Sequence, residues 1–305
     1  MCSINIDFIH AQELYYFTLH DKIEEARTYY RQKNYNKSLN AFKKLSNKIP
    51  EIACWYLGEH YYNGWGTKQN IEKAIEYYKN GAIYDCPYCE ERLSSHYFSN
   101  LKDNYNQSEA FYWSKIASLN PEGVEYGTPK TTYMLALCYL TGIGTSKNLL
   151  KAEIWMSLSA ILGYKDAITY YKKKYNTNSD IINPDSTVIF MYNLYNHLDS
   201  LILPSIYEDS SSEAKVIKCV HAYRIEDYKT FISLAKELSL ENKISEKGHY
   251  MICDLLYDYY KEYKYDLYNA DLMSKKMTEI GEVPIEKQKC WLIQQYVKCL
   301  ARYYK

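Results

Sequence analysis

The residues of this chain whose types and spacing most directly suggest chemistry are two cysteines in the tetrapeptide Cys86-Pro87-Tyr88-Cys89. A Cys-x-x-Cys pair can cycle between two thiols and a disulfide when the first sulfur lies at a helix N-terminus, where the helix dipole lowers its pKa. Pro87 suits the first position of such a helix. The tetrapeptide therefore predicts either a thiol redox centre or a helix start whose sulfurs are packed in a core.

The surroundings of the tetrapeptide favour the structural role. It is similar to the active-site sequence of glutaredoxins, but that motif follows a β-strand, whereas here a stretch with helical spacing at 71–82 precedes it. Cys89 also occupies the small-residue position of a repeat that is described below. A thiol redox protein that uses Cys86 and Cys89 is kept as the alternative of another class.

Other constellations of reactive residues are missing from the sequence. Cys86, Cys89 and His96 would leave a metal site incomplete, because no second Cys-x-x-Cys or His pair follows at zinc-finger spacing. No phosphate-binding loop, Gly-x-Ser-x-Gly, His-Glu-x-x-His or kinase signature occurs. We therefore expect a protein that is not an enzyme and that holds no cofactor or metal.

Composition and charge narrow the class of partner. The 305 residues are 47% hydrophobic, which is ordinary for a globular protein. Lys plus Arg and Asp plus Glu number 37 each, so the formal net charge is zero, which disfavours nucleic acid as a partner. The three lysines at 172–174 form the one tight basic run, which is typical of a solvated helix end.

The sequence also bears on the compartment. No run approaches the roughly 18 apolar residues that span a bilayer. The first ten residues have no basic region ahead of an apolar stretch, so they do not resemble a signal peptide. The nine scattered cysteines fit buried thiols in a reducing compartment better than a disulfide framework. We expect a cytoplasmic protein with no membrane contact.

A motif returns along the chain. Its first clear copy consists of Ala53, Leu57, Gly58, Tyr61, Gly64, Gly66, Asn70, Ala74 and Tyr77. Its second clear copy consists of Leu135, Ala136, Tyr139, Gly142, Gly144, Asn148, Ala152 and Trp155. Two degenerate copies consist of Cys89, Leu93, Ser94, Tyr97, Asn106, Ala110 and Trp113, and of Ala167, Tyr171, Tyr175, Val188 and Met191. The steps between residues 57, 93, 135 and 171 are 36, 42 and 36 residues, a period typical of stacked-repeat architectures.

Each copy predicts two helices joined by a glycine-containing loop. Gly58 would lie within the first helix, where glycine costs about 1 kcal/mol against alanine, so we expect a neighbouring helix to approach closely there. Gly64 and Gly66 permit positive φ and let the chain reverse. Asn70 is expected to cap the second helix, and Ala74 to face inward from it.

This pattern resembles the SEL-like repeat family, a branch of the tetratricopeptide-type α-solenoids. Residues 53–82 match the family pattern nearly position by position, residues 133–160 match it well, and the two degenerate copies match by register. Residues 20–50 resemble a plain tetratricopeptide repeat. The resemblance implies an all-α fold, a right-handed α-solenoid of stacked helical hairpins.

The chain divides by pattern into four parts: residues 1–50, an N-terminal helix and tetratricopeptide-like hairpin; 51–203, four repeats; 204–212, a linker; and 213–305, divergent helical hairpins. Within the last part, helices are predicted at 213–223, 226–239, 246–261, 266–280 and 285–304. We expect the last helix to cap the array, since terminal repeats present a polar outer face.

In solenoids of this type the first helix of each hairpin lines the concave face. The positions expected to point outward there are Trp55, Glu59, Tyr62, Tyr88, Glu91, Phe98, Tyr133, Leu137 and Leu140. A solvated helix face is mostly polar, so this apolar set predicts a protein interface, with Glu59 and Glu91 orienting a basic partner segment. The alternative is that tight superhelical curvature, or the C-terminal third folding back, buries these rings internally.

The resemblance implies a non-catalytic scaffold that binds a specific partner protein. Members of the family act as adaptors, regulators and effectors, and some bacterial members are immunity proteins that inhibit a toxin. A cytosolic immunity protein is therefore one hypothesis, and a secreted effector or a signalling adaptor is another. The oligomeric state stays open.

Overall fold

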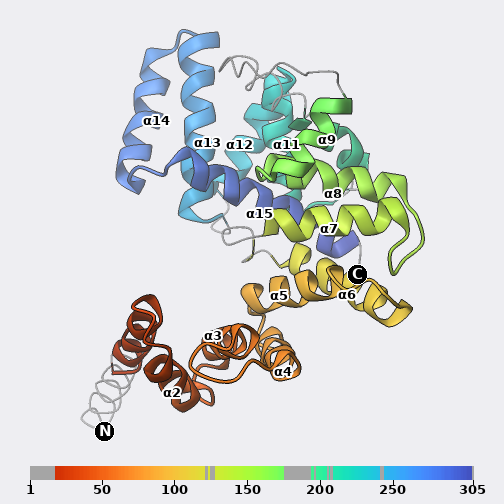
Figure 1. Cartoon of the computed structure of the whole chain (residues 1–305). Coiled ribbons are helices and arrows are strands. Elements are labelled where there is room, and N and C mark those ends of the chain that lie inside the picture. Colours follow the sequence, from red (N-terminus) through yellow and green to blue (C-terminus); the bar gives the residue numbers. More distant parts are fainter. Residues whose placement is uncertain are drawn as a thin grey trace, which may run out of the picture. The chain divides into compact units, whose positions relative to one another are not determined.

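The computed structural model describes residues 18–120, 123, 128–174, 194–195, 197–204, 206, 209–240 and 244–303. All regular elements within this described part are helices, which confirms the predicted all-α fold (Figure 1). The chain forms two compact units, residues 1–100 and 101–305. This boundary falls inside the predicted block of four repeats, and the four-part division by sequence pattern stays a prediction.

The first unit is a succession of hairpins in which each helix packs against the next. A helix at 18–31 precedes α2 (Tyr35–Leu45), α3 (Pro50–Asn63), α4 (Ile71–Ala82) and α5 (Pro87–Phe98). The helix α3 begins at a proline, whose fixed φ suits the first helical position, and it ends at Gly64 in the left-handed conformation with φ 72°. Local sequence therefore sets both ends of this helix.

The predicted close approach at Gly58 is confirmed. A Cβ atom at this position would lie 2.2 Å from Cε1 of Tyr78, so the ring of the neighbouring helix occupies the space that any larger residue would need. The predicted inward position of Ala74 is confirmed as well, since Ala74 is fully buried. The repeat thus pairs a glycine on one helix with a large ring on the other.

The predicted cap residues have their expected contacts in both clear copies of the repeat. The side chain of Asn70 accepts a hydrogen bond from the backbone N–H of Lys73 at 2.9 Å, and Asn148 accepts one from Lys151 at 3.0 Å. These bonds satisfy backbone donors that a helix start leaves unpaired. The same local chemistry therefore begins α4 in the first unit and α8 in the second.

The second unit contains the remaining helices. These are α6 (Asn104–Leu119), α7 (Thr128–Thr141), α8 (Leu149–Ile161), α9 (Lys165–Lys174), α11 (Ser212–Arg224), α12 (Tyr228–Leu240), α13 (Glu246–Asp258), the π-helix η2 (Tyr259–Tyr263), α14 (Leu267–Ile280) and α15 (Ile285–Tyr303). Hairpins form between α7 and α8, α11 and α12, and α13 and α14. The helices predicted beyond residue 212 are present within about two residues, except that the one predicted to end at 261 ends as η2.

The fourth copy of the repeat lies only partly within the described residues. Ala167 and Tyr171 of α9 are fully buried, as their register predicts. Tyr175, Val188 and Met191 lie outside the described residues. In the predicted linker, Ile206 is fully buried together with Leu198 of the preceding segment.

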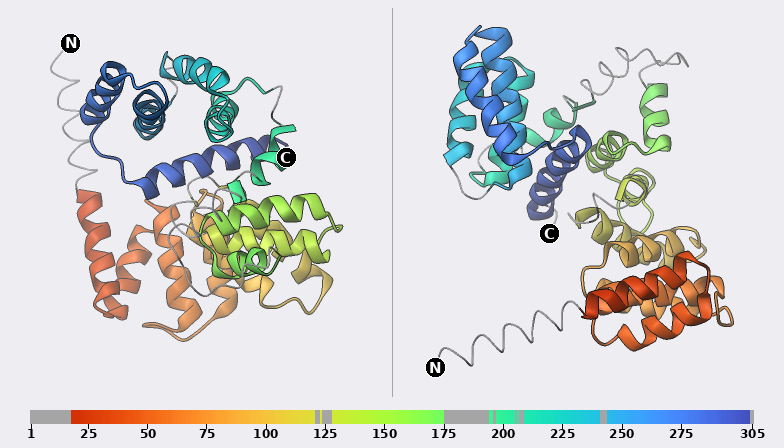
Figure 2. Two further views of the ribbon diagram at one scale, coloured as in Figure 1. Left: turned by 90° about the horizontal axis from the view of Figure 1, so that it is seen from above. Right: turned by 90° about the vertical axis from the view of Figure 1, so that its left-hand side faces the viewer.

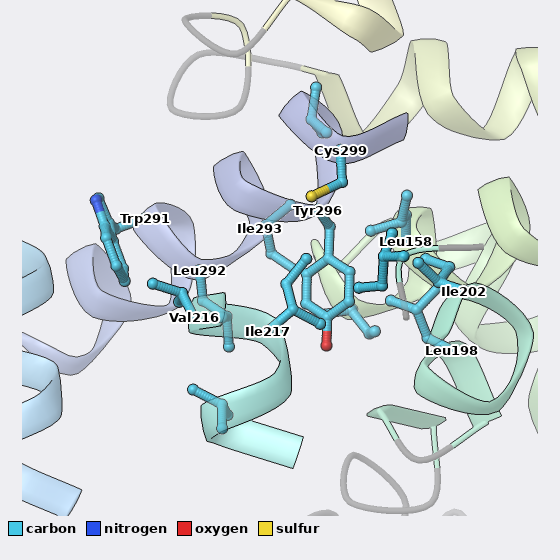
Figure 3. Close-up of a cluster of buried hydrophobic side chains, with 14 of the residues drawn as sticks. Leu158, Leu198, Ile202, Val216, Ile217, Trp291, Leu292, Ile293, Tyr296 and Cys299 are labelled. Atoms are coloured by element: carbon cyan, nitrogen blue, oxygen red, sulfur yellow. The ribbon is translucent and has the colours of Figure 1, made fainter. Parts of the chain in front are cut away.

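The expectation that the last helix caps the array is wrong. In the second unit α15 packs against α6, α11 and α13, and it runs between the C-terminal hairpins and the hairpin of α7 and α8 (Figure 2). Ile293, Tyr296 and Cys299 are fully buried, and Trp291 and Leu292 nearly so (Figure 3). Apolar residues occupy more than one face of this helix, so enclosure on several sides is the arrangement that removes them from water.

Candidate protein-binding face

In the first unit, two of the predicted anchors meet across neighbouring helices. Trp55 of α3 and Tyr88 of α5 have ring centroids 5.4 Å apart. Trp55 is half-buried, while Tyr88 is 38% exposed. Tyr62, Glu91 and Phe98 are half-buried on the same two helices. We name the surface formed by Trp55, Tyr62, Tyr88, Glu91 and Phe98 the α3–α5 face.

Trp55 is held in place from behind by tyrosines. Its ring lies 4.6 Å from Tyr56 and 6.2 Å from Tyr30, and Tyr30 lies 4.9 Å from Tyr56. Burial raises the pKa of Tyr30, so this ring is neutral at physiological pH. An aromatic side chain fixed on one side and accessible on the other can contact a partner with little loss of rotamer freedom.

The structure corrects the expectation for Glu59. This residue is only 2% exposed, and its carboxylate accepts hydrogen bonds from the Tyr78 hydroxyl at 2.7 Å and from Arg92 at 2.6 and 2.8 Å. Burial, followed by the charge of Glu59, raises the pKa of Tyr78. A buried carboxylate needs such partners, since an unpaired one would cost several kcal/mol. Glu59 therefore joins three helices and does not point outward to a partner.

Arg92 is the residue of this region that the sequence analysis missed. Its side chain is 43% exposed, and its guanidinium group makes a two-pronged contact with Glu59, 33 residues away. Trp55 and Glu59 are one helical turn apart on α3, and Tyr88 and Arg92 are one turn apart on α5. An aromatic contact and an ion pair therefore join the same two helices. The one signal in the sequence that could have indicated Arg92 was the repeat period, because residues about 33–36 positions apart in the chain lie side by side in successive repeats.

The predicted binding residues in the second unit are half-buried, as most of those in the first unit are. Tyr133, Leu137 and Leu140 of α7 are half-buried and pack against the core of this unit, which includes residues of α15. The ring of Tyr133 lies 5.0 Å from that of Tyr164. The aromatic neighbour of Tyr133 thus comes from the segment between α8 and α9, and the role of these three residues in binding stays a prediction.

The Cys-x-x-Cys pair has the predicted position but no accessible sulfur. Cys86 immediately precedes α5 and Pro87 is its first residue. Cys86 is nearly and Cys89 fully buried, and a Cβ atom at Gly81 would lie 2.3 Å from the Cys89 sulfur. A hydrogen bond between the two sulfurs lowers the pKa of Cys86 and, together with burial, raises that of Cys89. The packing around Cys89 supports the structural role.

The described residues also bear on two other features, a metal site and a membrane-spanning helix. Within them, no group of three or more His, Cys, Asp or Glu residues is placed to hold a metal ion. Among the same residues, none of the helices has the length and apolar character needed to cross a membrane.

Comparison with known proteins identifies the repeats. The family model of the Sel1 repeat matches residues 52–82, 95–120 and 129–164. The predicted fourth copy lies outside these stretches and stays a prediction. Among curated protein sequences, no match to the chain is found.

Two solved structures are similar to the chain. One is a protective antigen of uropathogenic Escherichia coli with an SLR fold, at 16% identity and a TM-score of 0.47, over 96% of this chain and 63% of that one. The other is a Sel1 repeat protein from Oxalobacter formigenes, at 17% identity and a TM-score of 0.44, over 85% of this chain and 100% of that one. This chain therefore spans less than two thirds of the length of the first.

Proposed function

We propose that this chain, which is a Sel1 repeat protein, is a non-catalytic scaffold that binds one specific partner protein through the α3–α5 face. The observation that carries the proposal is the contact between Trp55 and Tyr88, 5.4 Å apart on the first helices of two successive hairpins. Large aromatic side chains in partly desolvated positions contribute most of the energy in protein interfaces. Tyr133, Leu137 and Leu140 of α7 lie in the second unit, and their contact with a partner is a separate part of the proposal.

The charges of this face favour a partner that relies on apolar contacts. Glu59 and Arg92 neutralise each other, so neither offers an unpaired charge to a partner. Glu91 is a half-buried acidic residue of the α3–α5 face that also interacts within the chain, and its contribution to binding concerns the rate and orientation of association more than affinity. We therefore expect binding to depend only weakly on salt compared with a mainly ionic complex.

The finer proposal concerns the role of the complex. A cytosolic immunity protein would use the face to block a toxin, a signalling adaptor would join it to a second protein, and a secreted effector would use it on a protein outside the cell that makes it. The identity of the bound protein separates these roles. A toxin encoded beside the gene for this chain would support inhibition, whereas a sensor or secretion gene would support the other two.

The test is the double substitution Trp55→Ala with Tyr88→Ala. The partner is first isolated on the immobilised wild-type chain from the cells that produce it, and its affinity is then measured by calorimetry. Removing both rings should weaken binding by about a hundredfold or more, since each anchor contributes about 1.4 kcal/mol or more. Tyr112→Ala with Leu149→Ala, two exposed residues of other helices, is the matched control. Unchanged affinity in a folded double variant would contradict the proposal.

A further inference from the structure

A second apolar surface lies at the edge of the second unit, on α14 and the turn before it. Tyr265 and Tyr268 are 82% and 80% exposed, and Tyr263, Leu267 and Leu272 are also exposed. The helix α14 packs mainly against α13 and η2, and its other side has no neighbouring helix among the described residues of the unit (Figure 1). Five large apolar residues within ten positions are therefore left in contact with water.

The backbone of this turn presents its aromatic residue at a cost. Tyr265 has φ 53°, in the left-handed region that a bulky residue rarely adopts. This conformation costs on the order of 1 kcal/mol for a residue with a Cβ, and glycine would adopt it freely. Tyr265 follows the π-helix η2, an element that is rare and often marks functional sites. The strain and the exposure coincide at one residue.

The size of the surface suits a protein interface. The exposed parts of the three tyrosines together amount to about two whole tyrosine side chains, or about 400 Å². Monomeric proteins rarely leave larger apolar patches exposed, and each partner in a stable complex buries about 800 Å². The two leucines and the polar rim of α14 extend the area toward that value.

The charges on α14 favour a second copy of this chain as the partner. Asp271 and Lys275 form an ion pair of 2.7 Å along the exposed side of the helix, one turn apart. A copy of α14 laid antiparallel, with a two-fold axis level with residue 273, brings Asp271 of each copy level with Lys275 of the other. The same arrangement also places Leu272 of one copy beside Leu272 of the other. A parallel arrangement would instead oppose like charges.

We propose that two copies of this chain associate through an antiparallel contact between their α14 helices, with Leu272 at the apolar centre and Tyr265 and Tyr268 toward the two ends of the contact. The surface between residues 261 and 279 carries four lysines and four acidic residues, so it has no net charge to attract an anionic membrane. The inference is independent of the α3–α5 face, since the two surfaces lie in different units.

The experiment measures self-association of the full chain by sedimentation equilibrium. Leu272→Glu would place two carboxylates at the two-fold axis, and we expect the dimer dissociation constant to rise by about a hundredfold. Asp271→Lys should raise it by about tenfold, and the double reversal Asp271→Lys with Lys275→Asp should restore it. Leu149→Glu, an exposed leucine at the start of α8, should have no effect.

Tyr265→Gly separates a structural from a binding role. If the tyrosine served the fold alone, glycine would leave association unchanged and relieve the strained turn. The proposed dimer requires weaker association with equal or greater thermal stability. Circular dichroism confirms that each variant is folded. A wild-type chain that is monomeric at all concentrations, a dimer indifferent to Leu272→Glu, or binding of the monomer to phosphatidylserine vesicles through this surface would overturn the proposal.

Discussion

At the scale of single residues, His60 shows how a repeat places a polar group in its core. The ring is fully buried, and Nδ1 donates to the carbonyl oxygen of Trp65 at 2.7 Å. Because a carbonyl can only accept, the proton of neutral His60 lies on Nδ1, and Nε2 accepts from the Ser38 hydroxyl at 3.1 Å. Burial lowers the pKa of His60 below its ordinary value of 6.5.

This shift predicts acid sensitivity of the first unit. The unfolded chain binds a proton at His60 below about pH 6.5, whereas the folded chain binds it only at lower pH. The contribution of His60 to the free energy of unfolding is therefore present above that pH and is lost as the pH falls. Burial lowers the pKa of His96 in the same direction. His60→Gln should reduce the fall in melting temperature between neutral and mildly acidic pH. The control is His249→Gln in the second unit, and an unchanged pH slope in His60→Gln would contradict the assignment.

The buried sulfurs of Cys86 and Cys89 give a second prediction at this scale. Because Cys86, the sulfur that would attack, is only 5% exposed and Cys89 is fully buried against Gly81, a substrate disulfide cannot reach either sulfur in the folded chain. The wild type should therefore show no reduction of a glutathionylated test substrate, and Cys86→Ser with Cys89→Ser should leave partner binding intact. Turnover at a rate typical of redox catalysts would support the alternative of a thiol redox protein instead.

At the scale of the elements, the packing of α3 against α4 decides whether a methyl group added at Gly58 stabilises or destabilises the protein. Alanine favours a helix over glycine by about 1 kcal/mol, so propensity alone predicts that Gly58→Ala stabilises. The new Cβ would meet the Tyr78 ring at 2.2 Å, and the Tyr78 hydroxyl is bound to Glu59, which keeps the ring from moving away. We expect a net loss of about 1–3 kcal/mol from overpacking.

Urea unfolding measures this effect. The double variant Gly58→Ala with Tyr78→Leu removes the ring that the methyl group meets, so its loss should be smaller than the sum of the two single losses. Simple additivity of the two changes would show that the ring and the glycine do not interact.

At the scale of the whole molecule, the last helix stabilises the second unit from within. Asp199 is fully buried and accepts hydrogen bonds from Tyr296 of α15 and from Arg224 and His221 of α11. Burial raises the pKa of Tyr296 well above its ordinary value, so the hydroxyl stays a donor. A buried carboxylate thus joins segments that are 97 residues apart in the chain.

Tyr296→Phe removes one donor to this buried carboxylate. We expect a loss of about 1–3 kcal/mol in the free energy of unfolding, the cost of leaving a buried acceptor without one partner. Tyr112→Phe, on an exposed ring of α6 in the same unit, should change it by less than about 0.5 kcal/mol. Equal effects of the two substitutions would show that the network adds nothing to stability.

Local sequence specifies those features that depend only on neighbours a few residues away. Asn70 and Asn148 cap helices through backbone groups three residues on, and the glycine loops need only the freedom of φ, so the hairpins and their period could be predicted from the pattern. Burial of Glu59 and enclosure of α15 were decided by the tertiary structure. The carboxylate of Glu59 lies between helices α4 and α5, and the apolar faces of α15 have partners far along the chain. A register assigns a residue to a face of its own helix, but only the packing of other helices decides whether that face meets water.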